Sequence, residues 1–91
     1  MKTIYKIRRA ALRQSIRICK ERMIVQRAHL NLIEEMLRLD KDNEVYLTPH
    51  KEGCLLGERR RLRHRLERTK TKLEIYSQRF SLISQFLEDT E

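Results

Sequence analysis

The sequence predicts an all-α protein, an antiparallel two-helix hairpin of the coiled-coil type that dimerises into an elongated four-helix bundle. Three observations lead to this fold class. Apolar residues recur at alternating steps of four and three along two segments, a spacing that keeps them on one side of an α-helix. Gly and Pro are missing from the first segment and occur only at the start of the second. A short polar segment separates the two.

Residues 3–40 form the first predicted helix. Thr3 is a permissible N-cap, and the helical pattern continues without Gly or Pro to about Asp40. A β-strand would need alternation with period two, which this segment does not show. The residues that form its seam are Leu12, Ile16, Cys19, Met23, Gln26, Leu30, Ile33 and Leu37.

Residues 41–48 form the predicted turn. Asp42 and Asn43 interrupt the helical pattern because their side chains compete for backbone hydrogen bonds. Thr48 then offers an N-cap oxygen, and Pro49 suits the first helical position, where its missing N–H is not needed.

The second predicted helix covers residues 49–88. Gly53 and Gly57 weaken its first turns, so the sequence leaves open whether residues 49–54 are helical or the helix becomes firm only near Leu55. Three polar residues, Arg59, Thr69 and Gln26 of the first helix, occupy seam positions, where they commonly fix register or oligomeric state. The full second seam reads Leu55, Arg59, Leu62, Leu66, Thr69, Leu73, Tyr76, Phe80, Ile83 and Leu87.

The two helices should fold back on each other as one domain spanning residues 1–91, because each needs a partner for its seam. Residues near Leu12 should then lie close to Ile83. A chain of 91 residues with 40% hydrophobic residues buries only a modest share of its surface alone. We therefore expect a further partner.

A second apolar face on the first helix indicates where that partner binds. On a helical wheel its residues lie roughly 80–160° from the seam. A smaller apolar patch in the second helix, made of Ile75, Leu82 and Phe86, should lie beside it. A second copy of the hairpin can cover this face, and so can a different protein. The predicted interface residues are Ile4, Ile7, Ala11, Ile18, Val25, Leu32 and Met36.

The charge of the chain points to an anionic partner. The formal net charge is +8, from 21 basic and 13 acidic residues, and the basic residues are concentrated in rows along the two helices. A linear array of guanidinium groups on a rigid rod suits a phosphate backbone. The predicted nucleic-acid contacts are Arg61, Arg65, Arg68, Lys72 and Arg79 on the second helix, and Arg9, Arg13, Arg17 and Lys20 on the first, opposite its second apolar face.

Two other interpretations of the basic rows are weaker. A merely solvated helix face normally mixes charges of both signs, whereas these rows contain almost no acid. Binding to a membrane surface is disfavoured, because the basic residues do not lie opposite a free face rich in Trp or Phe.

No residue pattern predicts an enzyme, a metal or a cofactor. Cys19 and Cys54 have neither the number nor the spacing for a zinc site or a disulfide framework. Catalytic motifs and phosphate-binding glycine loops are missing from the sequence. Since it also contains no signal core and no apolar run of about 20 residues, we expect a protein of the reducing cytoplasm.

By architecture, the predicted hairpin resembles small helical hairpins that dimerise and bind RNA, such as Rop-type bundles and the hairpin suppressors with which some RNA viruses coat double-stranded RNA. The resemblance covers most of the chain but includes no residue motif. It implies a non-enzymatic homodimer that binds RNA in preference to DNA, in a role like that of RNA-silencing suppressors. The alternative is a coiled-coil adaptor, chaperone or inhibitor that binds a protein through the second apolar face.

Overall fold

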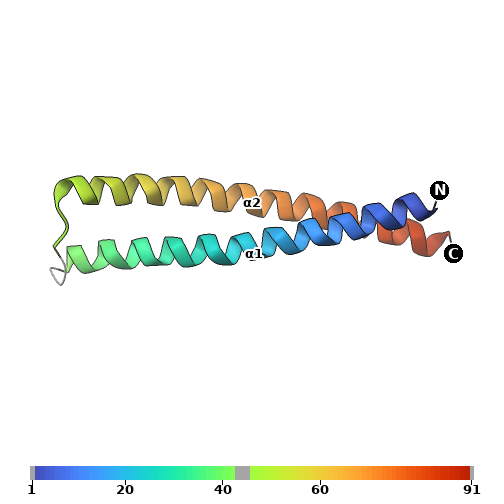
Figure 1. Ribbon diagram of the computed structural model, residues 1–91, viewed down its shortest axis with the longest axis horizontal. Coiled ribbons are helices and arrows are strands. Elements are labelled where there is room, and N and C mark those ends of the chain that lie inside the picture. Colours follow the sequence, from blue (N-terminus) through green and yellow to red (C-terminus); the bar gives the residue numbers. More distant parts are fainter. Residues whose placement is uncertain (1, 43–45, 91) are drawn as a thin grey trace.

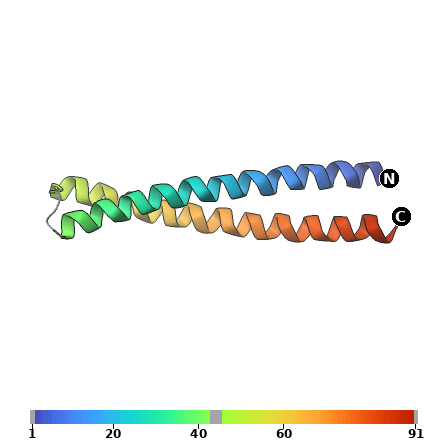
Figure 2. The same cartoon turned by 90° about the horizontal axis from the view of Figure 1, so that it is seen from below.

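The computed structural model describes residues 2–42 and 46–90 and contains two long helices, α1 (Lys2–Lys41) and α2 (Pro49–Asp89). They run antiparallel, side by side, as a hairpin (Figure 1 and Figure 2). The molecule is a rod measuring 64 × 17 × 14 Å. The predicted all-α hairpin is therefore confirmed.

The start of α2 follows the sequence prediction at its cap. The Thr48 backbone is extended, and its hydroxyl oxygen accepts a hydrogen bond from the Lys51 backbone N–H at 3.3 Å. Pro49 occupies the first turn. Before the cap, the Leu47 backbone N–H donates to the Asp40 carboxylate at 2.8 Å, which ties the segment back to α1. Asn43, predicted to help break the helix, lies outside the described residues.

The helix starts differ from the sequence expectation in one detail and resolve another that was open. α1 already includes Lys2, so Thr3 lies inside the helix and is not its N-cap. α2 is continuous from Pro49, so residues 49–54 are helical despite the two glycines. The Thr48 cap and the Pro49 ring stabilise the first turn enough to offset the weak helix propensity of Gly53 and Gly57.

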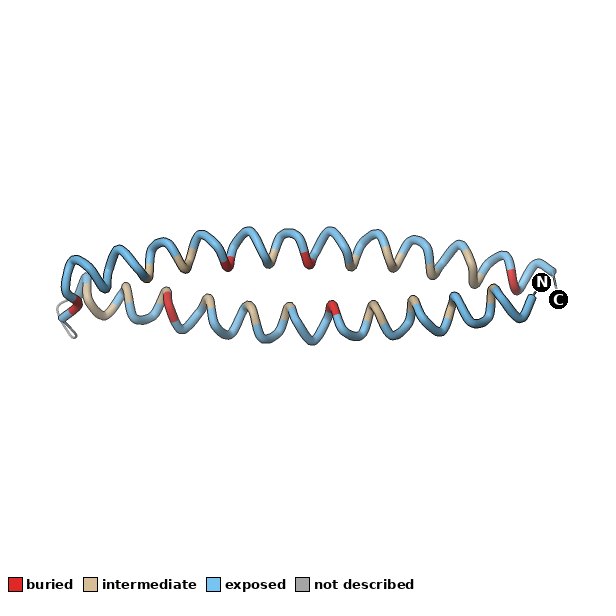
Figure 3. Tube along the Cα trace, turned by 45° about the horizontal axis from the view of Figure 1, so that its top comes forward, coloured by how far each residue is buried: buried red, intermediate tan, exposed pale blue. Residues whose placement is uncertain are grey.

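The buried and half-buried residues lie along the sides on which the two helices face each other (Figure 3), so the core is a single layer between them. All the predicted seam residues are buried or half-buried, and the most deeply buried are Ile33 and Leu87, at 2% and 1% exposure. Leu12 and Ile83 line the same depression, as the predicted register requires. Because one layer covers only one side of each helix, much apolar surface stays in contact with water.

A polar layer interrupts the middle of the seam. Gln26 of α1 and Thr69 of α2 line the same small cavity. The Thr69 hydroxyl donates to the Arg65 carbonyl at 2.9 Å. The side-chain oxygen of Gln26 is buried and has no hydrogen-bond partner within the described residues. Their proposed role in fixing register stays a prediction.

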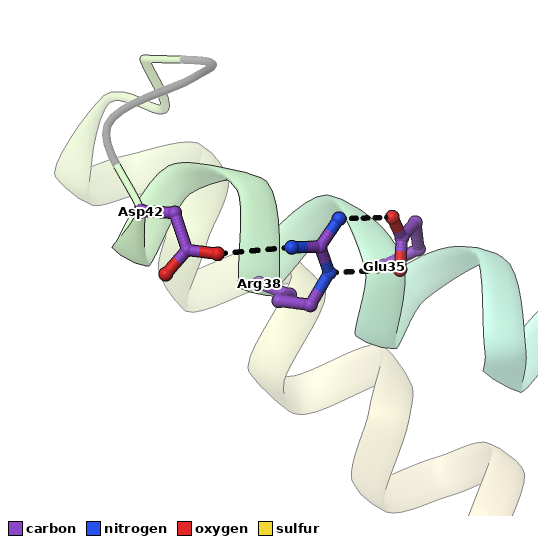
Figure 4. Close-up of polar contacts among 3 residues, drawn as sticks. All are labelled: Glu35, Arg38 and Asp42. Atoms are coloured by element: carbon purple, nitrogen blue, oxygen red, sulfur yellow. Dashed lines mark hydrogen bonds and ion pairs between the residues drawn. The ribbon is translucent and has the colours of Figure 1, made fainter.

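The end of α1 is held by a cluster of three charged residues (Figure 4). Arg38 donates to Glu35 from Nη2 at 2.5 Å and from Nε at 3.1 Å, and to Asp42 from Nη1 at 2.9 Å. The hydrogen bond from Arg38 holds the pKa of the Glu35 carboxyl below its ordinary value of 4.5. A cation here also complements the negative end of the helix dipole.

Candidate nucleic-acid interface

Two ion pairs between the helices define the two flanks of the seam. On one flank, His29 Nε2 of α1 lies 3.3 Å from Glu58 Oε1 of α2. On the other, Arg63 Nη2 of α2 donates to Glu34 Oε1 of α1 at 2.9 Å. Steps of seven residues keep a side chain on the same flank of a coiled coil. Each pair therefore identifies a whole row of residues on both helices, and we name the flanks after His29 and Glu34.

The His29 flank carries Arg8, Ser15 and Arg22 on α1, each seven residues from the next. On α2 the equivalents of Glu58 are Arg65, Lys72, Arg79 and Phe86. Two depressions confirm this assignment independently. Arg8, Ser15 and Arg79 line one of them, and Arg22, Arg65 and Lys72 line the other.

Most of the predicted α2 row lies together on this flank. Arg61, Arg65, Arg68 and Lys72 line one open depression of about 700 Å³, with His64, Glu67 and Thr71. Within the part of the chain that the structure describes, no carboxylate lies within 4 Å of these four cations. Four neighbouring cations thus face solvent without a paired acid.

Arg79 stands apart from the other four. It lines the depression at the open end of the hairpin, beside Ala11, Leu82 and Ile83. The structure therefore separates a compact basic row, Arg61 to Lys72, from Arg79, which shares a mainly apolar depression with Arg8.

Arg22 of α1 joins the basic row across the helices. It lines the same cavity as Arg65, Arg68 and Lys72. The helical wheel of α1 could not find it, because Arg22 lies on the side of the second apolar face. Arg22 comes close to the α2 row only because of the register in which the two helices pack. Aligning the two seams in antiparallel register would have identified it from the sequence.

The four predicted α1 contacts do not share the surface of the α2 row. Lys20 and Arg13 lie two and three heptads before Glu34, and therefore on the Glu34 flank. The Arg13 guanidinium lies 5.6 Å from the centre of the Phe80 ring, and Arg17 pairs with Glu21 at 3.3 Å. Arg9 is half-buried in the seam register. Arg9, Arg13 and Arg17 are therefore less accessible to a phosphate group than the α2 row is.

On α1 taken alone, the predicted basic contacts lie on the side opposite the second apolar face. In the hairpin, the apolar and basic surfaces are not separated in this way. Antiparallel packing brings equivalent flanks of the two helices together. As a result the α2 row lies on the same flank as Ala11, a member of the second apolar face. The predicted interface residues Ile4, Ile7, Ala11, Ile18, Val25, Leu32 and Met36 are all exposed on the hairpin.

Other chemistry is sparse in the described residues. Cys19 is buried in the seam, and the exposed Cys54 lies with Sγ 3.8 Å from His50 Nε2. Across residues 2–42 and 46–90, no three His, Cys, Asp or Glu side chains are grouped closely enough to hold a metal ion. Neither α1 nor α2 has a stretch that is long and apolar enough to cross a bilayer.

Fold and flanks together define a helical hairpin with an exposed apolar face on α1 and one row of cations, Arg61 to Lys72, that has no paired acid among the described residues. Comparison of the chain with protein-family models, with curated proteins and with solved structures finds no match. The function therefore has to be argued from the geometry of the flanks.

Proposed function

We propose that this hairpin is a non-enzymatic nucleic-acid-binding protein that acts as a homodimer. It contacts the phosphate backbone, of double-stranded RNA in preference to DNA, and reads little sequence. The observation that carries the proposal is the row of Arg61, Arg65, Arg68 and Lys72, four cations around one open depression without a paired carboxylate in the described chain.

The row costs the free protein stability. Like charges one helical turn apart destabilise a helix by a few tenths of a kcal/mol per pair. Arg22 brings a further positive charge to the same cavity. Phosphates bound along the row would offset this repulsion, since guanidinium groups donate to phosphate oxygens in pairs.

The proposed preference for duplex RNA rests on the straight shape of the basic surface. A straight helix that carries a row of cations matches a repeating backbone, and A-form duplexes are recognised mainly through shape, phosphates and 2′-hydroxyls. The hairpin has none of the helix-turn-helix geometry that places a recognition helix in the major groove of DNA.

The test is a salt-dependent titration of labelled duplex RNA, duplex DNA and single strands of equal length. Replacing Arg65 and Arg68 by Ala should weaken binding to all sequences similarly and reduce the slope of log K against log salt by about 2 per protomer. The matched control is the double variant Lys41→Ala and Lys51→Ala, which removes two exposed positive charges near the turn. Normal duplex binding by the Arg65 and Arg68 variant would contradict the proposal.

A third double variant, Arg13→Ala with Lys20→Ala, separates the two flanks. We expect a smaller loss of affinity than for Arg65 and Arg68, because Arg13 already packs over Phe80. A larger loss would assign the contact to the Glu34 flank.

An apolar depression favours a second candidate, a coiled-coil adaptor, chaperone or inhibitor. It measures about 450 Å³ and is lined by Arg8, Ala11, Leu12, Ser15, Arg79, Leu82 and Ile83. A protein partner could insert apolar side chains there. A hairpin that stays monomeric and ignores nucleic acid at ~150 mM salt would favour this function.

A further inference from the structure

The second apolar face of α1 contains a regular stripe. Ile4, Ala11, Ile18, Val25 and Leu32 are spaced by seven residues and are all exposed. The stripe runs for roughly 42 Å at ~1.5 Å per residue. An apolar residue at every seventh position keeps the stripe on one side of the helix and supplies one of the two positions per heptad that a coiled-coil contact uses.

We propose that a second copy of the hairpin covers this stripe, with the two α1 helices antiparallel about a two-fold axis at Ile18. In that register Ile4 meets Leu32 of the other copy, and Ala11 meets its Val25. Each residue of the stripe thus faces another residue of the same stripe, so the patch is self-complementary, as a two-fold interface requires.

The charges on α1 allow two copies to pack through the side that carries the stripe but not through the opposite side. The residues beside the stripe include Glu21 and Glu35 as well as Arg8 and Arg22, so two copies can approach. The opposite side carries cations at successive heptad positions: Lys6, Arg13, Lys20 and Arg27. Two copies of that side would repel each other.

The side chains of the stripe are also widely exposed. Ile4, Val25 and Leu32 are 56%, 68% and 60% exposed, so a second α1 packed against them removes apolar surface from water.

The arginines between the two α1 seams show that the dimer is open. In a closed four-helix bundle the side chains of Arg8 and Arg22 would point into the core, where an unpaired charge is strongly unfavourable. We therefore infer that the four helices of the dimer form a layer in the order α2, α1, α1, α2.

The layer has a consequence that rests on the proposed function. A two-fold axis perpendicular to the layer leaves the His29 flank of both copies on one face. The two rows from Arg61 to Lys72 then stand on the same face, separated by three interhelical spacings, roughly 25–30 Å in all. One duplex could contact both rows at once.

Sedimentation of two neighbouring variants tests the interface. Val25 and Ile24 are 68% and 69% exposed, but only Val25 belongs to the stripe. Val25→Glu should weaken dimerisation at least tenfold, while Ile24→Glu, on the basic side, should leave the dimer intact. Equal effects of the two variants, or a monomeric wild type, would overturn the inference.

Disulfide cross-linking tests the orientation, in a Cys54→Ser background that removes the exposed thiol. Ile18→Cys should cross-link to itself. Ala11→Cys and Val25→Cys should cross-link when mixed and not alone, whereas self-cross-linking of each alone would show parallel helices and overturn the inference. These readouts need no nucleic acid. A cross-linked dimer that ignores duplex RNA would refute the proposed RNA binding and leave the layer standing. A monomer that still binds RNA would refute the homodimer and its layer and leave the RNA binding standing.

Discussion

Arg63 of α2 donates to Glu34 of α1 at 2.9 Å, near the turn of the hairpin. His29 and Glu58 make the corresponding pair on the other flank. Both pairs are largely exposed, so each contributes at most about 1 kcal/mol. Their position matters more than their strength. Towards the middle of the rod the facing residues become like charges, with Arg22 beside Arg65, so electrostatics helps close the turn end and opposes closure along the basic row.

Arg22→Glu should therefore stabilise the free hairpin and impair its function. The new carboxylate would face Arg65 as Glu34 faces Arg63, a gain of a few tenths of a kcal/mol at low salt. The same change removes a cation from the proposed binding face, so affinity for duplex RNA should fall. Urea unfolding and the RNA titration measure the two effects. Arg22→Gln is the control, and a drop in stability with Glu would contradict the register.

Leu62→Ala tests how much the one-layer core contributes. Leu62 is 5% exposed, while the nearby Leu56 is 40% exposed. Deleting a buried leucine costs about 2–5 kcal/mol, and the lower end applies where neighbours can close the gap. We expect roughly 2–3 kcal/mol for Leu62→Ala and little change for Leu56→Ala, measured by urea unfolding. Similar losses for both would mean that the seam is displaced.

Gly57→Ala should stabilise the hairpin. A Cβ atom at Gly57 meets nothing within 4 Å, and alanine in a helix interior is favoured over glycine by about 0.5–1 kcal/mol. Gly53 has the same open surroundings and serves as an independent repeat. Thermal unfolding monitored by circular dichroism would show a raised midpoint, and an unchanged or lowered midpoint would show that these glycines are needed for a contact.

The charged cluster at the end of α1 predicts a pH dependence. The hydrogen bond from Arg38 lowers the pKa of Glu35 in the folded state. Its contribution to stability is therefore present above the ordinary pKa of 4.5 and is lost as the pH falls through the lower folded value. In urea unfolding, the stabilities of wild type and Glu35→Gln should converge as the pH falls well below the ordinary value of 4.5. In an Arg38→Ala background the two should not diverge at any pH.

Individual helices could be predicted from the sequence better than the surfaces they form together. The spacing of residues such as Ile33 and Leu62 follows from one helix alone, and so does the Thr48 cap. The placement of Arg22 beside Arg65 depends on the antiparallel register, which a wheel drawn for one helix does not contain. The N-cap prediction at Thr3 failed because the helical pattern has no break before it.

At the open end, Lys2 donates from Nζ to the Thr90 carbonyl at 2.5 Å, across 88 positions of sequence. A short linker could thus join the two ends, and the chain could be reopened between α1 and α2 to give a circular permutant. That permutant would present the same seam and both flanks with the helices synthesised in the reverse order. What defines the surface is then the pairing of two helices, whichever comes first.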